Sequence, residues 1–291
     1  MVWWKNHRYF DIGFIYYIEC LLKENQMIYK GMFYQIKGEG FPIVFLPGIG
    51  GTHSMFDPQI QFLAKSFKTI AIDMKGSGKS VSISVKPWEC FEEHVSALIE
   101  LLDYLGVAKF ILVGISYGGI VAQKLAISNP ERVAKLVLID TYAHTIPRNI
   151  NEIKLLFYGA FIAFSPWLPS QWIKPFFSHY KKWELAYNEI DMIIENRNPK
   201  DVTAQLVGCA GLNLFKELEE LDIPTLGLVG DVSPLIVNKT KEIIEHLPNG
   251  KFAVIEDAID PSNLCQPNIV NTYLFDFIQE LSSSSKAVSG T

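Results

Sequence analysis

The sequence predicts an α/β fold with a mostly parallel central sheet, flanked by helices and carrying an inserted helical lid. Short apolar runs alternate with segments of helical periodicity over most of the chain, which is the pattern of strands buried on both faces and separated by helices. Between one such run and one such helix stands the pentapeptide Gly114-Ile115-Ser116-Tyr117-Gly118. A strand, a sharp turn and a helix in that order place the turn at the carboxyl edge of a parallel sheet, where ligands bind.

The expected strands are short apolar runs bounded by turn-forming residues, at 42–46, 67–73, 110–113, 133–140, 225–230 and 251–256. A helix is expected over 91–105, because Val95, Leu98, Ile99 and Leu102 share one face and Gly106 can end it. Another follows the pentapeptide over 120–126. This alternation of elements accounts for the predicted parallel sheet.

Ser116 is placed as a nucleophile would be. The backbone of such a turn is strained, and small neighbours, here Gly114 and Gly118, permit it. The turn lifts the hydroxyl above the sheet edge and aims the first N–H groups of the following helix at the reacting centre. The Tyr117 N–H can therefore donate to a developing oxyanion.

Together, several motifs resemble the α/β-hydrolase family over about residues 28–281. They are the loop Pro47-Gly48-Ile49-Gly50-Gly51, the stretch 72–80, the turn at Ser116, Leu138-Ile139-Asp140, and the C-terminal frames 230–234 and 257–260 followed by Gln266-Pro267. The resemblance implies an esterase- or lactonase-like serine hydrolase of small apolar esters, lactones or amides. It also implies that the Ile49 and Tyr117 N–H groups form the oxyanion hole.

The sequence departs from the family at two positions of the catalytic triad. Ser233 stands where the acid is expected, and Asp260 stands where the histidine is expected. A serine hydroxyl needs a base within hydrogen-bond reach, and a carboxylate is a weaker base than imidazole unless it is desolvated. Two hypotheses follow: a hydrolase with a non-standard base, or a triad-degenerate protein that binds an apolar small molecule or guides a non-hydrolytic reaction.

Three further residues are candidates for the missing roles. His53 and His144 lie on the loops that flank Ser116 in the predicted sheet, and either could replace the base. Alternatively, His53 caps a helix start or lines the pocket, and His144 is a solvated loop residue. Asp231 could act as a displaced acid or could accept turn N–H groups ahead of Pro234.

The predicted organisation is one core with an insertion. Residues 1–26 are an N-terminal extension, 27–141 and 219–281 form the core, 142–218 form the lid, and 282–291 form a disordered serine-rich tail. The lid is rich in aromatic residues, most of which are expected to pack and some to roof the cleft. They are Phe157, Tyr158, Phe161, Phe164, Trp167, Trp172, Phe176, Phe177, Tyr180, Trp183 and Tyr187.

Composition narrows the classes of partner. A net charge of −5 without a basic stripe argues against nucleic-acid binding. The four cysteines are scattered, which indicates free thiols and a cytoplasmic protein, and no metal or organic cofactor is implied. The apolar stretch 12–18 is too short to span a bilayer, so stable membrane insertion is not expected. The sequence leaves the oligomeric state open.

Overall fold

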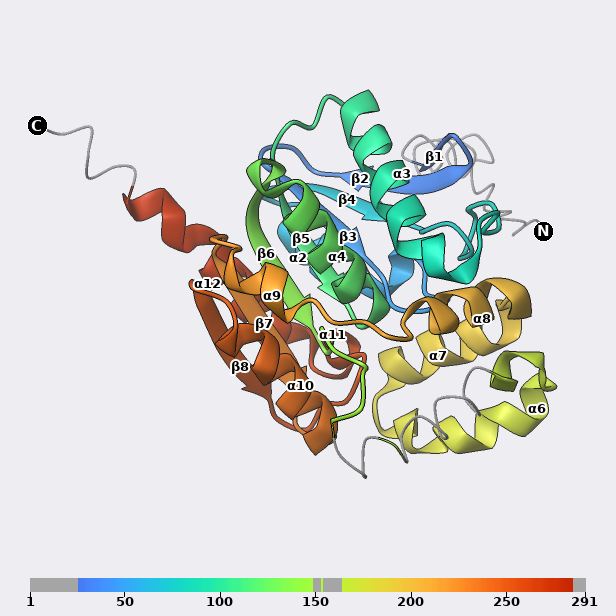
Figure 1. Ribbon diagram of the computed structural model, residues 1–291. Coiled ribbons are helices and arrows are strands. Elements are labelled where there is room, and N and C mark those ends of the chain that lie inside the picture. The colour runs from blue at the N-terminus through green and yellow to red at the C-terminus, as the bar shows by residue number, and fades with distance from the viewer. Residues whose placement is uncertain (1–25, 149–152, 154–163, 285–291) are drawn as a thin grey trace, which may run out of the picture.

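The computed structural model describes residues 26–148, 153 and 164–284. Eight strands form one sheet in the order β1-β2-β4-β3-β5-β6-β7-β8 (Figure 1). The first two pairings, β1 with β2 and β2 with β4, are antiparallel, and all the others are parallel. The predicted α/β fold with a mostly parallel sheet is confirmed.

The parallel strands lie within one or two residues of their predicted bounds. They are β3 (Pro42–Leu46), β4 (Lys68–Ile72), β5 (Phe110–Ile115), β6 (Val133–Ile139), β7 (Thr225–Gly230) and β8 (Gly250–Ile255). Two antiparallel strands that were not predicted, β1 (Gln26–Tyr29) and β2 (Met32–Lys37), extend one edge of the sheet. Strand β5 is buried along its whole length, because β3 and β6 cover its edges and helices cover both its faces.

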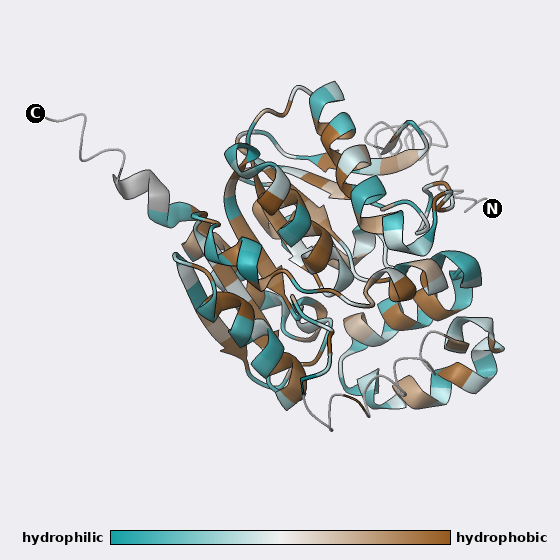
Figure 2. Cartoon of the chain, viewed as in Figure 1, coloured by the Kyte–Doolittle hydropathy of each residue, from teal (hydrophilic) through white to brown (hydrophobic). Residues whose placement is uncertain are grey.

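Helices cover both faces of the sheet. One face carries α3 (Cys90–Tyr104), α4 (Tyr117–Ser128), α10 (Pro234–Glu245) and the short α9 (Phe215–Glu219), and the other carries α2 (Asp57–Leu63) and α12 (Pro267–Ser284). These outer helices carry both teal and brown residues in Figure 2, as helices with one buried face do. The central sheet is thus enclosed between two helical layers.

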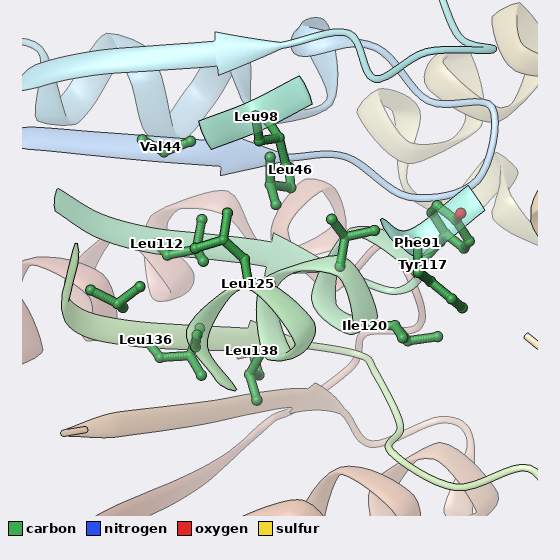
Figure 3. Close-up of a cluster of buried hydrophobic side chains, with 14 of the residues drawn as sticks. Val44, Leu46, Phe91, Leu98, Leu112, Tyr117, Ile120, Leu125, Leu136 and Leu138 are labelled. Carbon is green, nitrogen blue, oxygen red and sulfur yellow. The ribbon is translucent and has the colours of Figure 1, made fainter. Parts of the chain in front are cut away.

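Each strand contributes alternate side chains to the two layers, because successive residues of a strand point to opposite faces. On β3, Val44 and Leu46 join the cluster under α3 and α4, where Figure 3 shows them beside Leu112 and Leu136. On the same strand, Ile43 and Phe45 join the cluster under α2 and α12. The carboxyl ends of β3, β5, β6 and β7 are therefore held in fixed relation to one another.

The lid is helical in the part that the structure describes. It contains η4 (Ser165–Trp167), α6 (Ser170–Ile173), η5 (Lys174–Lys182), α7 (Glu184–Asn196) and α8 (Pro199–Gly208), which gather at one side of the molecule (Figure 1). Arg197 joins them, since its guanidinium donates to the Pro166 carbonyl at 3.1 Å and to the Ser170 hydroxyl at 3.0 Å, and also to the Leu168 and Ile194 carbonyls.

One predicted boundary differs from the structure, and several side chains show how the outer layers pack. Helix α12 continues through Ser284, three residues into the segment predicted as a disordered tail, and residues 285–291 lie outside the described part. Of the lid aromatics, Phe164, Trp167, Trp172 and Phe176 are more than half exposed. His94, on α3, is buried between the Lys75 carbonyl and the Tyr117 hydroxyl.

Candidate active site

Ser116 occupies a strained turn between β5 and α4. Its φ is +51°, in the region that side-chain-bearing residues rarely adopt, and its own N–H donates to the Ile139 carbonyl at 2.9 Å. Thr141 fixes the next peptide, since its hydroxyl donates to the Ser116 carbonyl at 2.7 Å. The turn is therefore tied on both sides to β6 and the residues that follow it.

The glycines around Ser116 are required by close packing. A Cβ on Gly118 would lie 2.2 Å from the Leu46 carbonyl oxygen, and one on Gly114 would lie 2.4 Å from the Gly118 carbonyl oxygen. A Cβ on Gly119 would meet the Thr141 hydroxyl at 2.6 Å. The turn and the end of β3 consequently approach more closely than any larger residue would allow.

Two backbone N–H groups remain unused beside this turn. Tyr117 is the first residue of α4, so its N–H has no acceptor within the helix. Ile49 lies in the loop after β3, whose residue Gly48 would place a Cβ 3.4 Å from that of Ser116. Within residues 26–148, 153 and 164–284, neither N–H donates to a backbone or side-chain acceptor. Both amides fit the predicted oxyanion role, which they would fill together.

The structure brings Asp260 to Ser116. Burial and the neighbouring Asp140 carboxyl raise the pKa of the Asp260 carboxyl to about 8, and the Ser116 side chain next to it acts in the opposite direction. Ser116 and Asp260 each retain some accessible surface, although Asp140 and Tyr117 beside them are buried.

Asp140 forms the inner end of this group. Its carboxylate accepts the Gly230 N–H at 2.9 Å and the Ser262 N–H at 2.7 Å, so it ties together the ends of β6 and β7 and the loop that carries Asp260. Burial raises the pKa of Asp140, and the two amide hydrogen bonds oppose that rise. Two neighbouring carboxyls in a desolvated site resist double ionisation and share one proton near neutrality. Because Asp140 holds two amide donors, we place the proton on Asp260.

The two positions on the loop after β7 do not join this group. Ser233 is the N-cap residue of α10, and its side chain makes no capping hydrogen bond. Asp231 is exposed and accepts the Ala258 N–H at 3.2 Å, so this hydrogen bond joins it to the loop after β8 and not to its own turn. The acid beside Asp260 therefore comes from β6, at Asp140, and not from the loop after β7.

His53 lies beside the end of β4, the strand that pairs with β3 on the side away from β5. Its Nδ1 lies 2.8 Å from Asp73 Oδ1, and its backbone N–H donates to the same oxygen at 2.7 Å. Asp73 follows β4, which lies two strand spacings, about 10 Å, from β5. The His53 ring lies tilted against Phe33, with 4.9 Å between centroids, and within the described residues His53 makes no hydrogen bond to Ser116 or Asp260.

His144 is buried rather than solvated, contrary to the alternative considered for it. Its ring stacks on Phe215 with 5.4 Å between centroids, and Phe215 stacks in turn on His246 at 4.0 Å. The Lys239 ammonium donates to the His144 carbonyl at 3.1 Å. These contacts hold His144 beside α9 and α10. None of these contacts involves Ser116.

The lid contacts the loop that carries Asp260. The Tyr180 hydroxyl donates to the Asp260 carbonyl at 2.6 Å, and Trp183 Nε1 donates to the Asp257 carbonyl at 3.0 Å. Lys182 pairs with the Asp257 carboxylate. Phe177 and Tyr187 pack against the core cluster under α2 and α12, whereas Phe157, Tyr158 and Phe161 lie outside the described residues.

Sequence reasoning overlooked several of these contacts. Tyr180 was grouped with the aromatic residues of the lid, and Asp140 was named only within the motif Leu138-Ile139-Asp140. The single available signal was the position of Asp140 at the end of a strand next to β5, which brings it to the same sheet edge as Ser116. No pattern in the sequence indicated that the loop around Asp260 would fold back onto it.

The structure contains neither a candidate metal site nor a candidate membrane span among the residues that it describes. Among residues 26–148, 153 and 164–284, no group of three or more His, Cys, Asp or Glu side chains is arranged to hold a metal ion. Cys90, Cys209 and Cys265 are buried free thiols. In the same part of the chain, no helix has the length and apolar character to cross a membrane.

The fold and this edge define a class: an α/β protein with a serine elbow at the carboxyl end of the central strand of a parallel sheet, covered by a helical lid. The model of the alpha/beta hydrolase fold family matches residues 42–260, and the chain belongs to that family.

Known proteins of similar sequence and structure agree with this assignment. The chain is 27% identical over 249 residues to a pimeloyl-[acyl-carrier protein] methyl ester esterase of Legionella pneumophila, covering 83% of this chain and 97% of that protein. A thermophilic esterase from Thermogutta terrifontis superposes with a TM-score of 0.72 at 24% identity, covering 88% of this chain and 97% of that one. The enol-lactonase from Burkholderia xenovorans LB400 superposes with a TM-score of 0.74 at 19% identity, covering 88% of this chain and all of that one.

Proposed function

We propose that the protein is a serine hydrolase of small apolar esters, lactones or amides, in which Ser116 is the nucleophile and Asp260 is its base. The observation that carries the proposal is the buried Asp260 carboxyl, which interacts with the Ser116 side chain and whose pKa burial raises to about 8. A base of that pKa is closer to imidazole than to an ordinary carboxylate. It therefore meets the requirement that a solvated aspartate at this position would not.

The reaction would proceed in two halves. Ionised Asp260 accepts the Ser116 proton while Ser116 Oγ attacks the substrate carbonyl carbon, and the resulting oxyanion accepts the Ile49 and Tyr117 N–H groups. Protonated Asp260 then returns the proton to the leaving alcohol or amine, which leaves an acyl-enzyme. Water repeats the sequence, releases the carboxylic acid and regenerates the Ser116 hydroxyl. Asp140 retains its two amide donors throughout and keeps the pKa of Asp260 high.

Two facts support the substrate class. A Cβ on Gly50 would meet Ile193 at 3.2 Å and Val202 at 3.5 Å, so apolar lid side chains cover the loop that carries Ile49. The relatives include an esterase by sequence and an esterase and an enol-lactonase by structure. An acyl group of modest size and apolar character suits such surroundings.

The test is turnover of nitrophenyl esters of increasing acyl length at pH 9, together with labelling by a fluorophosphonate, on wild type and S116A. We expect turnover and labelling that both depend on Ser116. D260H should keep activity and bring it to lower pH, because an imidazole beside Asp140 restores a base of lower pKa. A folded wild type that neither turns over nor is labelled contradicts the proposal.

One observation favours a second candidate function. At pH 7 a carboxyl with a pKa of about 8 is mostly protonated, so Asp260 would then donate a hydrogen bond and not accept a proton. A protein that binds an apolar carbonyl compound, or guides a non-hydrolytic reaction, could use Asp260 and Ser116 as donors. In that case binding of an apolar ketone weakens as pH rises through 8, and no ester is hydrolysed at any pH.

A further inference from the structure

The loop that carries Ile49 has a backbone fixed at three successive peptides. The Gly51 N–H donates to the Gly48 carbonyl at 3.0 Å. That carbonyl belongs to the same peptide as the Ile49 N–H, and in a trans peptide the two groups point in opposite directions. The preceding peptide is held by the Gly48 N–H, which lies 3.3 Å from Met55 Sδ.

The third fixed peptide is held from the lid. Gln205, on α8, accepts the Gly50 N–H at 3.1 Å through its side-chain oxygen. This hydrogen bond fixes the peptide directly after Ile49. Gly50 has a φ of +64°, and a glycine without such a bond could adopt several other backbone conformations. Met55 and Gly51 are local to the loop, whereas Gln205 is 155 residues away along the chain.

Gln205 is itself held in one orientation. Its side chain is fully buried, and its Nε2 donates to the Ser77 hydroxyl at 3.3 Å and to the Lys75 carbonyl at 3.4 Å. With the amide nitrogen committed to those two acceptors, the amide oxygen must face Gly50. The side chain therefore acts as a rigid link between α8, the loop after β4 and the loop after β3.

A second lid helix holds the far end of the same loop. Glu189, on α7, is buried and accepts the Ser54 hydroxyl at 2.9 Å. This hydrogen bond lowers the pKa of Glu189 against the larger effect of burial. Two lid helices thus hold this loop at both ends, at Gly50 and at Ser54.

We infer that Gln205 is a positioning residue for the oxyanion hole: through Gly50 it sets the direction of the Ile49 N–H. The lid is then part of the catalytic scaffold and not only a cover over the cleft. This inference rests on the proposed function, since it assigns the donor geometry of the same site. Gln205 touches no reacting atom and acts through the loop.

The decisive variant is Q205M, which keeps the side-chain length and removes the acceptor. Loss of an oxyanion donor lowers kcat by about 10²- to 10³-fold, so a displaced donor should lower it by roughly 10- to 100-fold. The KM should change by less than about 3-fold, because ground-state contacts remain. A trifluoromethyl ketone, whose adduct places an oxyanion in the hole, should bind more weakly by about the same factor as kcat/KM falls.

Two controls separate positioning from general damage to the lid. R197M removes the guanidinium that joins the lid helices but touches neither loop, so it should lower thermal stability and leave kcat within about 3-fold of wild type. Q205E keeps an acceptor for the Gly50 N–H, so it should retain more kcat than Q205M. The midpoint of the pH profile should stay near 8 in all three variants, since Asp260 is not altered.

The outcomes are separable. Wild-type kcat in Q205M, or an equal loss in R197M, overturns the inference and leaves the proposed function intact. Absence of Ser116-dependent labelling in the wild type overturns the proposed function and this inference with it. Should Q205M fail to fold, Q205L, which also lacks the acceptor, carries the test: kcat lowered roughly 10- to 100-fold supports positioning, and kcat within about 3-fold of wild type contradicts it.

Discussion

At the scale of single residues, the site depends on a pair of carboxyls. Asp260 alone, in water, would be a poor base for Ser116. Desolvation and the charge of Asp140 change that by making the ionised form of Asp260 less stable and so more basic. In the proposed mechanism, Asp260 therefore supplies the base in place of the family's histidine, provided that Asp140 keeps its charge.

The charge of Asp140 can be tested by D140N. Without that neighbouring negative charge the pKa of Asp260 should fall, so activity should reach its plateau at lower pH than in wild type. The variant should also be destabilised by about 1–3 kcal/mol, because an NH2 group replaces one carboxylate oxygen and one of the two N–H groups, that of Ser262 or that of Gly230, loses its acceptor. The pH dependence of kcat/KM measures the first effect. D231N is the control, and an equal shift in it would assign the acid role to Asp231.

Glu189 gives a prediction about stability and pH. Burial raises its pKa to about 7, so the folded state binds its proton more tightly than the unfolded chain does. The stabilisation from that proton is complete below pH 4.5 and is lost as pH rises from about 4.5 through 7. E189Q should therefore gain stability relative to wild type over that range, on the order of 2 kcal/mol.

Urea unfolding at pH 4.5 and pH 8 measures this gain. The matched control is E184Q, an exposed position on the same helix, whose difference from wild type should not vary with pH. A difference between E189Q and wild type that is the same at both pH values would contradict the raised pKa.

The residue scale also shows how far sequence reasoning reaches. Ser116, Ile49 and Tyr117 follow from local motifs, because a strand, a turn and a helix fix their positions within a few residues. The pairing of Asp140 with Asp260 depends on two loops far apart in the chain, joined through the Ser262 N–H. Such a contact has no local signature. The same is true of His53, whose partner Asp73 could not be identified before β4 was placed beside β3.

At the scale of elements, the turn between β5 and α4 is the most constrained feature. It requires glycine for contact as well as for conformation. Its neighbours Leu46 and Pro47 present carbonyl oxygens against Gly118 at distances that no Cβ can occupy. The helix predicted over 91–105 was placed to within one residue, at Cys90–Tyr104, because its apolar face and terminal glycine are both local signals.

Gly118 offers a direct test of this packing. G118A should destabilise the protein by about 3 kcal/mol or more, since β3 and α4 would have to separate. G106A is the control: nothing lies within 4 Å of an added Cβ there, and only the φ of +66° opposes it, at about 1–2 kcal/mol. Urea midpoints compare the two. Equal destabilisation would show that backbone conformation, and not contact, explains Gly118.

At the scale of the whole molecule, the lid and the core are joined at several points. Tyr180 and Trp183 bind the loop that carries Asp260, and Gln205 binds the loop that carries Ile49. The sequence predicted a lid from its broken strand alternation and its aromatic content. It could not predict these anchor points, because a polar lid residue that faces the core has no distinctive spacing.

We therefore expect the lid and the core to unfold together. Y180F removes the hydrogen bond to the Asp260 carbonyl and should shift the unfolding transition by about 1 kcal/mol, with a reduced kcat because the Asp260 loop is less firmly held. Tryptophan fluorescence, to which the lid contributes three of the six tryptophans, and circular dichroism should give coincident transitions in wild type and variant. Y187F is the control, and a separate lid transition would contradict a shared scaffold.

The most direct test of the whole account is the rate of fluorophosphonate labelling at Ser116 as a function of pH, in wild type and D260N. Because Asp260 must be ionised to accept the serine proton and has a pKa of about 8, labelling of the wild type should rise from pH 6 and level off above pH 9. D260N should be labelled at least about 100-fold more slowly at every pH. Labelling that is equally fast in D260N, or that does not depend on pH between 6 and 10, would contradict the assignment of Asp260 as the base.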